Sequence, residues 1–298
     1  MSEMSNKNLL DILQERLQEH SNMENVINDL HSRITDIQEK LTESESLKSH
    51  FISNITNEII NPFASILGLS QNILALKDDE IEKAKSIADL IYMEAFQLDF
   101  DLKNIFMAAK IEAGEIDPEV VKVDVNKLIP SAIDQFKYEI KRKKIEFIYD
   151  FEIKKELNKI YYFKTDPEKL KLIIANLISN AIKFSEDGSK VFVTSCLEND
   201  LLSISVSDSG IGIDKEKIQE IFDRFKQLDS TIHSLNRGYG LGLSVTRGLI
   251  EVLNGQIEIT ESDKGGSNFT ISIPQSDLDA DDISEDENEL FFDKEEIV

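Results

Sequence analysis

The first 61 residues contain neither glycine nor proline, the two residues that most often interrupt a helix. Within this stretch apolar residues recur at alternating steps of four and three, the spacing of the a and d positions of a coiled coil. The series consists of Met23, Ile27, Leu30, Ile34, Ile37 and Leu41. An apolar stripe this narrow predicts a partner helix, most simply from a second copy of the chain. The alternative is a lone amphipathic helix packed on its own domain.

A helical hairpin is expected next. The heptad spacing loses its phase over residues 42–46, and an apolar helical pattern resumes after it. A second helix is expected from about Asp79 to Ala113, with an aspartate of the preceding polar break as N-cap and Gly114 as C-cap. The broad apolar face of this hairpin predicts a four-helix bundle with a second copy.

After Pro118 short apolar runs typical of strands alternate with helical segments. Strands are expected at about 120–123, 145–151, 191–196, 202–206, 256–260 and 268–273. Helices are expected at about 126–142, 167–183, 214–221 and 241–253, and the basic run 141–144 is interpreted as a solvated helix end. The chain is therefore predicted to be an α+β multidomain protein. Its predicted parts are a coiled coil (1–46), the hairpin (47–118), an α/β sandwich (119–275) and a disordered acidic tail (276–298).

Composition excludes several classes of protein. The 33 Lys and Arg residues against 57 Asp and Glu give a formal net charge of −24, which argues against binding to nucleic acid or to an anionic membrane. Cys196 is the single cysteine, so no disulfide forms within the chain, and the Cys and His spacing offers no zinc site. No apolar run approaches the ~18 residues of a transmembrane helix, and residues 1–25 lack a signal-peptide pattern. We expect a cytoplasmic protein without membrane insertion.

A helix at 167–183 carries the first part of a predicted nucleotide site. Asn176 and Asn180 are four residues apart and share a face, and Lys183 follows within one turn. Mg²⁺ takes oxygen ligands and keeps several waters, so an asparagine carbonyl together with ATP phosphates suits it. Two asparagines on a helix are more often solvated or capping, so this segment alone is a weak signal.

Three further segments complete the pattern: a loop after a strand, an aromatic pair, and a glycine-rich stretch that opens a helix. An acidic residue after a strand can accept a hydrogen bond from an adenine amino group, and glycines let the backbone approach a ligand closely. N–H groups at a helix start cradle phosphate. These residues are Asp208, Gly210 and Gly212; Phe222 and Phe225; and Gly238, Gly240 and Gly242. All four segments in this order form a strong signal.

The segment from Asp166 to Pro274 closely resembles the catalytic ATP-binding domain of bacterial sensor histidine kinases, which share a superfamily with gyrase- and Hsp90-type ATPases. The resemblance implies an α/β sandwich with a flexible lid over ATP, here at about 226–237. It also implies roles for individual residues. These are Asn180 as Mg²⁺ ligand beside Asn176, Lys183 and Arg237 at phosphates, Phe184 along the adenine, and Asp208 as the adenine acceptor.

The hairpin resembles the dimerisation and phosphoacceptor domain of the same family, whose motif is Ser/Thr-His-Glu-x-x-Thr/Asn-Pro. Here the motif reads Thr-Asn-Glu-Ile-Ile-Asn-Pro, and Asn57 stands in place of the histidine. By the resemblance, Glu58 assists phosphotransfer and Asn61 positions water for dephosphorylating a response regulator. An amide nitrogen has its lone pair delocalised into the carbonyl and is no useful nucleophile. We therefore predict no autophosphorylation at position 57.

The sequence thus predicts the core of a two-component sensor histidine kinase. The resemblance implies a homodimer that uses ATP and Mg²⁺ and signals to the receiver domain of a response regulator. A second kinase subunit that carries a histidine is a further predicted partner, through a mixed dimer. The alternative is an ATP-binding pseudokinase scaffold or phosphatase that regulates a partner kinase or response regulator. The hairpin before the domain disfavours a gyrase-like ATPase and an anti-sigma-factor serine kinase.

Overall fold

The computed structural model describes residues 23, 27–38, 42, 59–77, 79–153, 162–223, 240–262 and 265–278. The chain divides into two compact units, residues 1–57 and 58–298. Several predicted features lie outside the described residues: Asn57, Glu58, Phe225, the lid, Arg237, Gly238 and the acidic tail from residue 279 on. The predicted domain boundaries stay predictions.

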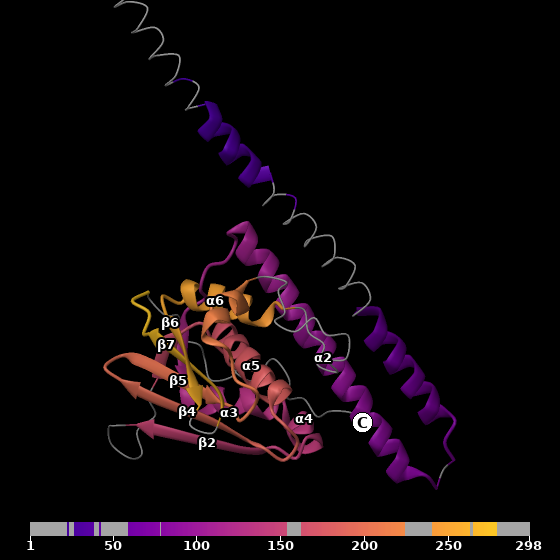
Figure 1. Ribbon diagram of the computed structural model, residues 1–298. Helices are drawn as coiled ribbons and strands as arrows, with labels where there is room; N and C mark the ends of the chain where they lie inside the picture. Colours follow the sequence, from indigo (N-terminus) through magenta and orange to yellow (C-terminus); the bar gives the residue numbers. More distant parts are fainter. Residues whose placement is uncertain are drawn as a thin grey trace, which may run out of the picture. The chain divides into compact units, whose positions relative to one another are not determined.

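In the first unit, residues 27–38 are helical, as the heptad pattern predicts (Figure 1). The apolar residues of the pattern that are described are each 48–63% exposed; they are Met23, Ile27, Leu30, Ile34 and Ile37. Within a single chain the stripe therefore keeps much of its apolar surface in contact with water. A partner helix that covered this surface would stabilise the helix through the hydrophobic effect. A partner helix over this stripe remains a prediction.

The second unit begins with a helical hairpin, in which residues 59–74 are helical and α2 spans Ile81–Ala113. Gly114 ends α2 in the left-handed conformation at φ 67°, which confirms the predicted C-cap. The predicted aspartate N-cap is wrong. Glu80 occupies that position, and its carboxylate accepts a hydrogen bond from the backbone N–H of Lys77 at 3.2 Å instead of capping the helix.

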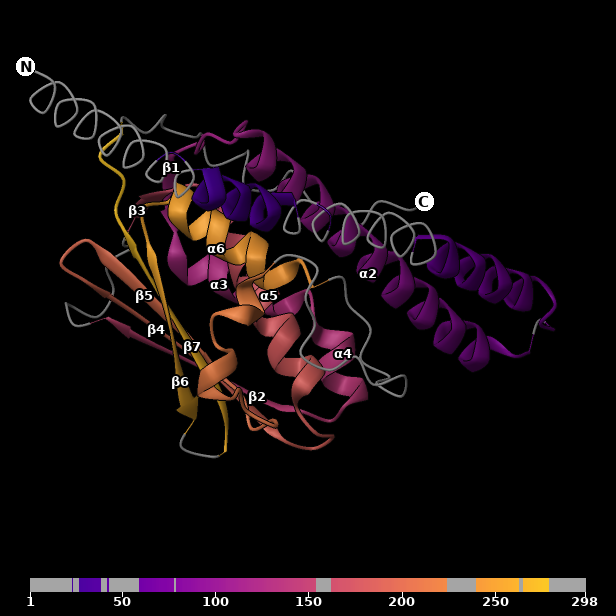
Figure 2. The ribbon, with the colours of Figure 1, turned by 45° about the horizontal axis from the view of Figure 1, so that its top comes forward.

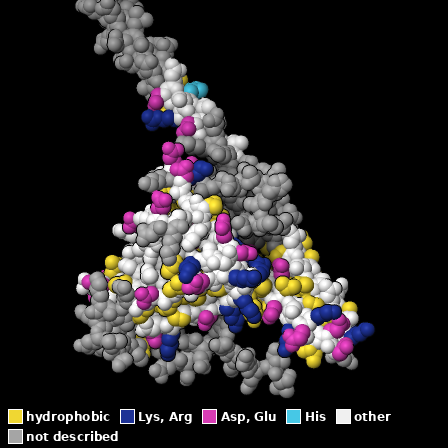
Figure 3. All heavy atoms as spheres, turned by 60° about the horizontal axis from the view of Figure 1, so that its bottom comes forward, with side chains coloured by type: hydrophobic (Ala, Val, Ile, Leu, Met, Phe, Trp, Pro, Cys, Tyr) yellow, Lys and Arg dark blue, Asp and Glu magenta, His cyan; other side chains and the backbone are white. Residues whose placement is uncertain are grey.

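Apolar side chains of the hairpin stay exposed, and hydrophobic groups are visible among charged ones at the surface in Figure 3. The exposed fractions are 53–85% for Ile60, Phe63, Leu67 and Leu74 of the first helix, and Phe106 of α2 is 64% exposed. Such an exposed apolar face suits the predicted four-helix bundle, which stays a prediction. Among the residues with described coordinates, no helix is both long and apolar enough to cross a membrane.

The rest of the unit is an α/β sandwich, as predicted (Figures 1 and 2). Among the described residues its main sheet has the strand order β2-β4-β5-β7-β6, with β2 parallel to β4 and the other neighbours antiparallel. These strands are β2 (Glu146–Ile153), β4 (Lys190–Glu198), β5 (Leu201–Ser207), β6 (Gln256–Ser262) and β7 (Gly266–Pro274). A separate two-stranded sheet pairs β1 (Val121–Asp124) with β3 (Tyr162–Thr165).

Helices cover one face of the main sheet, as both ribbon views show. They are α3 (Val125–Asp134), α4 (Lys137–Arg142), α5 (Pro167–Phe184) and α6 (Gly242–Val252). Ile173, Ile174, Leu177 and Ile178 of α5 are fully buried. Burial of each such side chain contributes about 1.5–3 kcal/mol, so α5 is firmly held by the core.

Three local predictions need correction. The single helix expected at 126–142 is two helices, α3 and α4, because the chain turns at Gln135 and Phe136. The helix expected at 214–221 is two short 3₁₀ turns, η1 (Lys215–Lys217) and η2 (Glu220–Phe222). Strand β3 was not predicted, because its four residues, Tyr-Phe-Lys-Thr, do not alternate apolar with polar.

Candidate nucleotide-binding site

Helix α5 carries the first predicted site residues. It begins at Asp166, whose Oδ1 accepts a hydrogen bond from the backbone N–H of Lys169 at 2.9 Å, and Pro167 occupies the first helical turn. Asn180 and Lys183 are half-buried near the carboxyl end of the helix, and Phe184 is 43% exposed. The Nζ atom of Lys183 lies 5.3 Å from the centre of the Phe184 ring. The last turn of α5 therefore presents an amide, an ammonium group and an aromatic face.

Asn176 has a different environment from Asn180, although both lie on α5. Its side chain is 2% exposed, and its Nδ2 donates a hydrogen bond to Oδ1 of Asn104 in α2 at 2.8 Å. Asn104 is itself 4% exposed, and its Nδ2 donates to the carbonyl of Phe100 at 3.1 Å. A Cβ atom on Gly242 would lie 3.2 Å from Oδ1 of Asn176. Asn176 thus occupies an interior contact between α2, α5 and the start of α6.

Asp208 follows β5 and is 6% exposed. Its Oδ1 accepts hydrogen bonds from the backbone N–H groups of Gly210 at 2.8 Å and Ser267 at 3.2 Å. Burial raises the pKa of the Asp208 carboxyl, and these two hydrogen bonds partly oppose the rise. Within the described part of the chain, Oδ2 has no hydrogen-bond partner. One oxygen is therefore held by the backbone while the other can accept from a ligand.

Two glycines at this site lie in close contact with the backbone of other segments of the chain. A Cβ on Gly210 would lie 2.5 Å from the carbonyl oxygen of Phe184, so the loop after β5 rests on the end of α5. A Cβ on Gly266 would lie 2.4 Å from the carbonyl oxygen of Asp208. Neither Gly266 nor Ser267 was predicted as a site residue, although the Gly-Gly-Ser run at 265–267 was a visible signal of close backbone approach.

The remaining predicted residues lie at the start of α6 and beside it. Gly212 and Gly240 have positive φ angles of 72° and 64°, a conformation that favours glycine. Helix α6 begins at Gly242, and its N-cap residue Leu241 makes no side-chain capping hydrogen bond, so among the described residues the first N–H groups of the helix are open to a ligand. The guanidinium group of Arg247, on α6, lies over the ring of Phe222, with its Cζ atom 5.7 Å from the ring centre. The structure thus brings α5, the Asp208 loop and the start of α6 to one region.

Comparison with known proteins agrees with this geometry. Residues 165–277 match the family model of the histidine kinase-, DNA gyrase B- and HSP90-like ATPases. The chain is 29% identical over 236 residues to the circadian input-output histidine kinase CikA of Synechococcus elongatus, a match that spans 79% of this chain and 31% of CikA. Residues 165–277 thus form a histidine kinase-type ATPase domain, and the similarity to sensor histidine kinases extends over most of the chain. A match to the autoinducer 2 sensor kinase/phosphatase LuxQ of Vibrio vulnificus is 33% identical over 238 residues.

The match to LuxQ spans 78% of this chain and 27% of LuxQ, so the chain covers about a third or less of CikA and of LuxQ. Among solved structures, full-length ShkA in complex with AMPPNP has a similar fold. The TM-score is 0.53 at 21% identity, over 79% of this chain and 47% of ShkA. This likeness confirms the predicted arrangement of a helical region followed by an α/β sandwich of the histidine kinase type.

The described residues could hold a magnesium ion only together with the phosphates of a bound nucleotide. The described residues contain no group of three or more His, Cys, Asp or Glu side chains that could hold a metal ion. The half-buried Asn180 supplies one neutral amide oxygen, a donor of the kind that Mg²⁺ accepts. The remaining ligands would be phosphate oxygens and water, which matches a cation that arrives with its nucleotide.

The contact between Asn104 and Asn176 leads to a first prediction. Asn104→Leu leaves the buried amide of Asn176 without its partner, so the free energy of unfolding of the second unit should fall by about 1–3 kcal/mol. Urea denaturation followed by circular dichroism measures the loss. The double variant Asn104→Leu with Asn176→Leu removes both polar groups and should recover most of it. A double variant as unstable as the sum of two single variants would contradict the paired amides.

Proposed function

We propose that the chain is a sensor histidine kinase core that binds Mg²⁺·ATP, and that it does not autophosphorylate at position 57. The observation that carries ATP binding is the junction of Asp208, Gly210 and Phe184 described above. There a carboxylate oxygen, two closely packed glycine segments and an exposed aromatic ring meet at the carboxyl end of α5, and α6 starts at Gly242 against Asn176 of the same helix. These are the groups that an adenine base and a chain of phosphates need.

Different residues of the site would bind the adenine, the phosphates and the metal ion. Oδ2 of Asp208 accepts a hydrogen bond from the adenine amino group, and the Phe184 ring lies along the base. Lys183 and the first N–H groups of α6 meet the phosphates. Asn180 holds the metal with the phosphates, and bound Mg²⁺ supplies neutralisation of their charge. Phe225, Arg237 and Gly238 would complete the phosphate side.

The acceptor position separates this chain from a self-sufficient kinase. Asn57 supplies no nitrogen lone pair for attack on the γ-phosphorus, so Glu58 has no imidazole to assist. Asn61, on the helix that starts the hairpin, would still position water for dephosphorylating a response regulator, the proposed partner. The same substitution favours a second candidate function. In it the chain binds ATP as a pseudokinase scaffold or phosphatase and regulates a partner kinase or response regulator.

Homodimerisation is part of the proposal. Its support is the exposed heptad stripe at Ile27, Leu30 and Ile34, together with the exposed apolar side chains of the hairpin. Two copies would cover these faces in a coiled coil and a four-helix bundle. In a mixed dimer, a second kinase subunit with a histidine at the acceptor position would receive the phosphoryl group from ATP bound here.

Calorimetric titration with ATP in excess Mg²⁺ tests nucleotide binding, and its pH dependence tests the role of Asp208. Burial raises the pKa of this carboxyl above the ordinary ~3.9 of aspartate, so it gains its proton at a higher pH than most carboxylates. The ionised form is the stronger acceptor. Affinity should therefore fall as pH falls through the raised pKa, by about fivefold, since hydrogen bonds to a charged group exceed neutral ones by roughly 1 kcal/mol.

The matched control is Asp208→Asn, which keeps an acceptor oxygen but cannot titrate. It should bind ATP about tenfold more weakly at neutral pH. The pH dependence that remains in this variant belongs to ATP and to other groups, and the difference between the two curves belongs to Asp208. Equal pH curves for both chains would remove Asp208 from adenine recognition. No binding by the unmodified chain would overturn the proposed function.

A further inference from the structure

Lys143 lies in the basic run 141–144, which the sequence presents as a solvated helix end. Lys141, Arg142 and Lys144 are exposed, as that interpretation predicts. Lys143 is the exception. Its side chain is half-buried, and its Nζ donates hydrogen bonds to the carbonyl oxygens of Ile182 at 2.8 Å, Lys183 at 3.0 Å and Ser185 at 3.0 Å.

These three carbonyls stand at the carboxyl end of α5, where backbone acceptors have no partner within the helix. Ser185 follows the helix in an extended conformation, and its N–H donates to the carbonyl of Ala181. A left-handed glycine, which commonly satisfies the last carbonyls, is absent from this cap position. The three N–H donors of one ammonium group take its place, with a positive charge at the negative end of the helix dipole.

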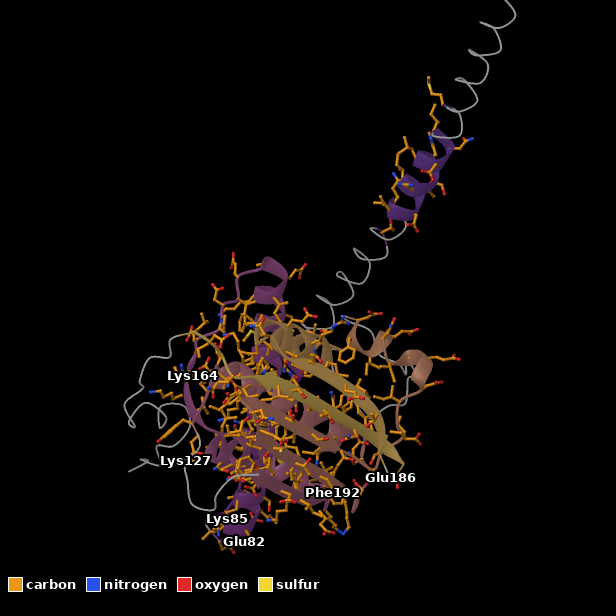
Figure 4. The ribbon with its side chains drawn as sticks, turned by 90° about the vertical axis from the view of Figure 1, so that its left-hand side faces the viewer. Glu82, Lys85, Lys127, Lys164, Glu186 and Phe192 are labelled. Carbon is orange, nitrogen blue, oxygen red and sulfur yellow. The ribbon has the colours of Figure 1, made fainter. Side chains whose placement is uncertain are left out.

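The corner that carries Lys143 is fixed to the turn after α5. The carbonyl of Lys143 accepts a hydrogen bond from the N–H of Gly188 at 2.8 Å, and the N–H of Glu146 donates to the carbonyl of Ser189 at 2.9 Å. Strands β2 and β4 then run parallel from Glu146 and Lys190, so both strands start at the same edge. Glu186 in this turn and Phe192 on β4 are labelled in Figure 4.

The pKa of Lys143 reflects the partial burial of its ammonium group. Burial lowers the pKa of the Lys143 ammonium group, and the carboxylate of Asp187 acts in the opposite direction. A lysine side chain has four flexible carbons, and ordering it against three carbonyls costs side-chain entropy. The three hydrogen bonds to a charged donor offset that cost.

The capped end of α5 is also the edge of the nucleotide site. Phe184 lies between two of the carbonyls that Lys143 binds, and its own carbonyl oxygen packs against Gly210 in the adenine loop. We propose that Lys143 is a positioning residue for the nucleotide. It holds the last turn of α5 so that Lys183 and Phe184 face the ligand. The inference rests on the proposed binding of ATP at this site and adds a residue outside it.

The test uses the full chain with Lys143→Met, which keeps the length of the side chain but removes its donors. Affinity for ATP in excess Mg²⁺, measured by calorimetry, should fall about tenfold, equivalent to about 1.4 kcal/mol. Lys143→Arg keeps a charged donor and should bind within about threefold of the unmodified chain. Lys141→Met is the matched control, because it makes the same charge change at an exposed position of the same run.

A second readout separates positioning from general stability. In an Asn57→His background that autophosphorylates, Lys143→Met should raise the KM for ATP about tenfold and change kcat by less than about twofold. Hydrogen exchange should rise in peptides covering residues 180–189 and stay unchanged over 167–175 of the same helix. A fall in kcat with an unchanged KM would overturn the proposal.

The outcomes also distinguish this inference from the proposed function. If the unmodified chain binds no ATP, both fall. If the unmodified chain binds ATP and the Lys143→Met variant binds it equally well, only the proposed role of Lys143 is overturned. The same holds if Lys143→Arg loses as much affinity for ATP as Lys143→Met. Should Lys143→Met fail to fold, Lys143→Gln keeps an N–H donor group and decides instead. A loss of about threefold supports the cap, and unchanged affinity overturns it.

Discussion

Replacing Asn57 by histidine should turn the chain into one that phosphorylates itself. The motif around position 57 is otherwise complete, with Glu58 following and Asn61 three residues later. An imidazole nitrogen supplies the lone pair that the amide lacks, and the adjacent glutamate can assist its attack on the γ-phosphorus. Incubation with γ-labelled ATP and Mg²⁺ should give at least about 100-fold more label than the unmodified chain. The label should be lost in acid and survive in alkali, as expected of phosphohistidine.

Two controls make this result specific. Asn57→Gln keeps an amide at the acceptor position and should stay unlabelled. Asn57→His combined with Asp208→Ala keeps the histidine but loses the adenine acceptor, so its labelling should fall with nucleotide affinity. His50, seven residues before position 57, is followed by Phe51 rather than by an acid. Label on the unmodified chain would show that another nucleophile serves, and the block at Asn57 would be wrong.

A failure of Asn57→His to gain label has a defined meaning. If that variant still binds ATP, the scaffold becomes the better account of the chain, because a nucleotide and a nucleophile are then both present without transfer. Mixing it with the unmodified chain extends the experiment. In this mixture the Asn57→His copy also carries Asp208→Ala, so that it binds ATP poorly itself. Label on this copy would then show transfer from ATP bound by the other subunit of a mixed dimer.

The sequence predicts the elements of the sandwich well where periodicity is long. Helix α5 has eighteen residues with a continuous apolar face, and its predicted span 167–183 differs from the observed Pro167–Phe184 by one residue. Short elements failed for a physical reason. Three-residue turns such as η1 contain too few positions for a period to appear, and the residues of strand β3, Tyr-Phe-Lys-Thr, do not alternate apolar with polar. Their conformation depends on contacts with distant parts of the chain.

The candidate site divides in the same way. Asp208 and the glycines around it were predicted because a carboxylate and glycines in one loop form a local pattern. Asn104 and Lys143 were not predicted, since each acts on a helix distant in the sequence, through a hydrogen bond of 2.8 Å to a residue of α5. A polar residue on a buried helix face was the only sign of Asn104. Nothing in the basic run distinguished Lys143 from its neighbours.

Asp166→Ala should destabilise the second unit more than any other single truncation considered above. Asp166 is 1% exposed and binds three groups, the backbone N–H of Lys169, the Nζ of Lys169 at 2.5 Å and the backbone N–H of Glu119 at 2.8 Å. The alanine variant removes the N-cap of α5 and leaves the ammonium group of Lys169, which is 8% exposed, without its counter-charge. The free energy of unfolding should fall by about 3–5 kcal/mol.

Urea denaturation measures this loss, with Asp124→Ala as the matched control. Asp124 is the N-cap of α3 and accepts a hydrogen bond from the backbone N–H of Asn126 at 3.0 Å, but no ion pair depends on it among the described contacts. Its removal should cost only about 1 kcal/mol. Equal losses in the two variants would reduce Asp166 to an ordinary cap.

The double variant Asp166→Ala with Lys169→Met identifies the source of the larger loss. If the unpaired buried charge is the cause, replacing the ammonium group by an apolar side chain of similar length should restore about 1–3 kcal/mol. If the double variant is no more stable than Asp166→Ala, the loss comes from the cap and from the contact to Glu119. Because α5 carries Asn180, Lys183 and Phe184, ATP affinity should follow the same order among the variants as stability.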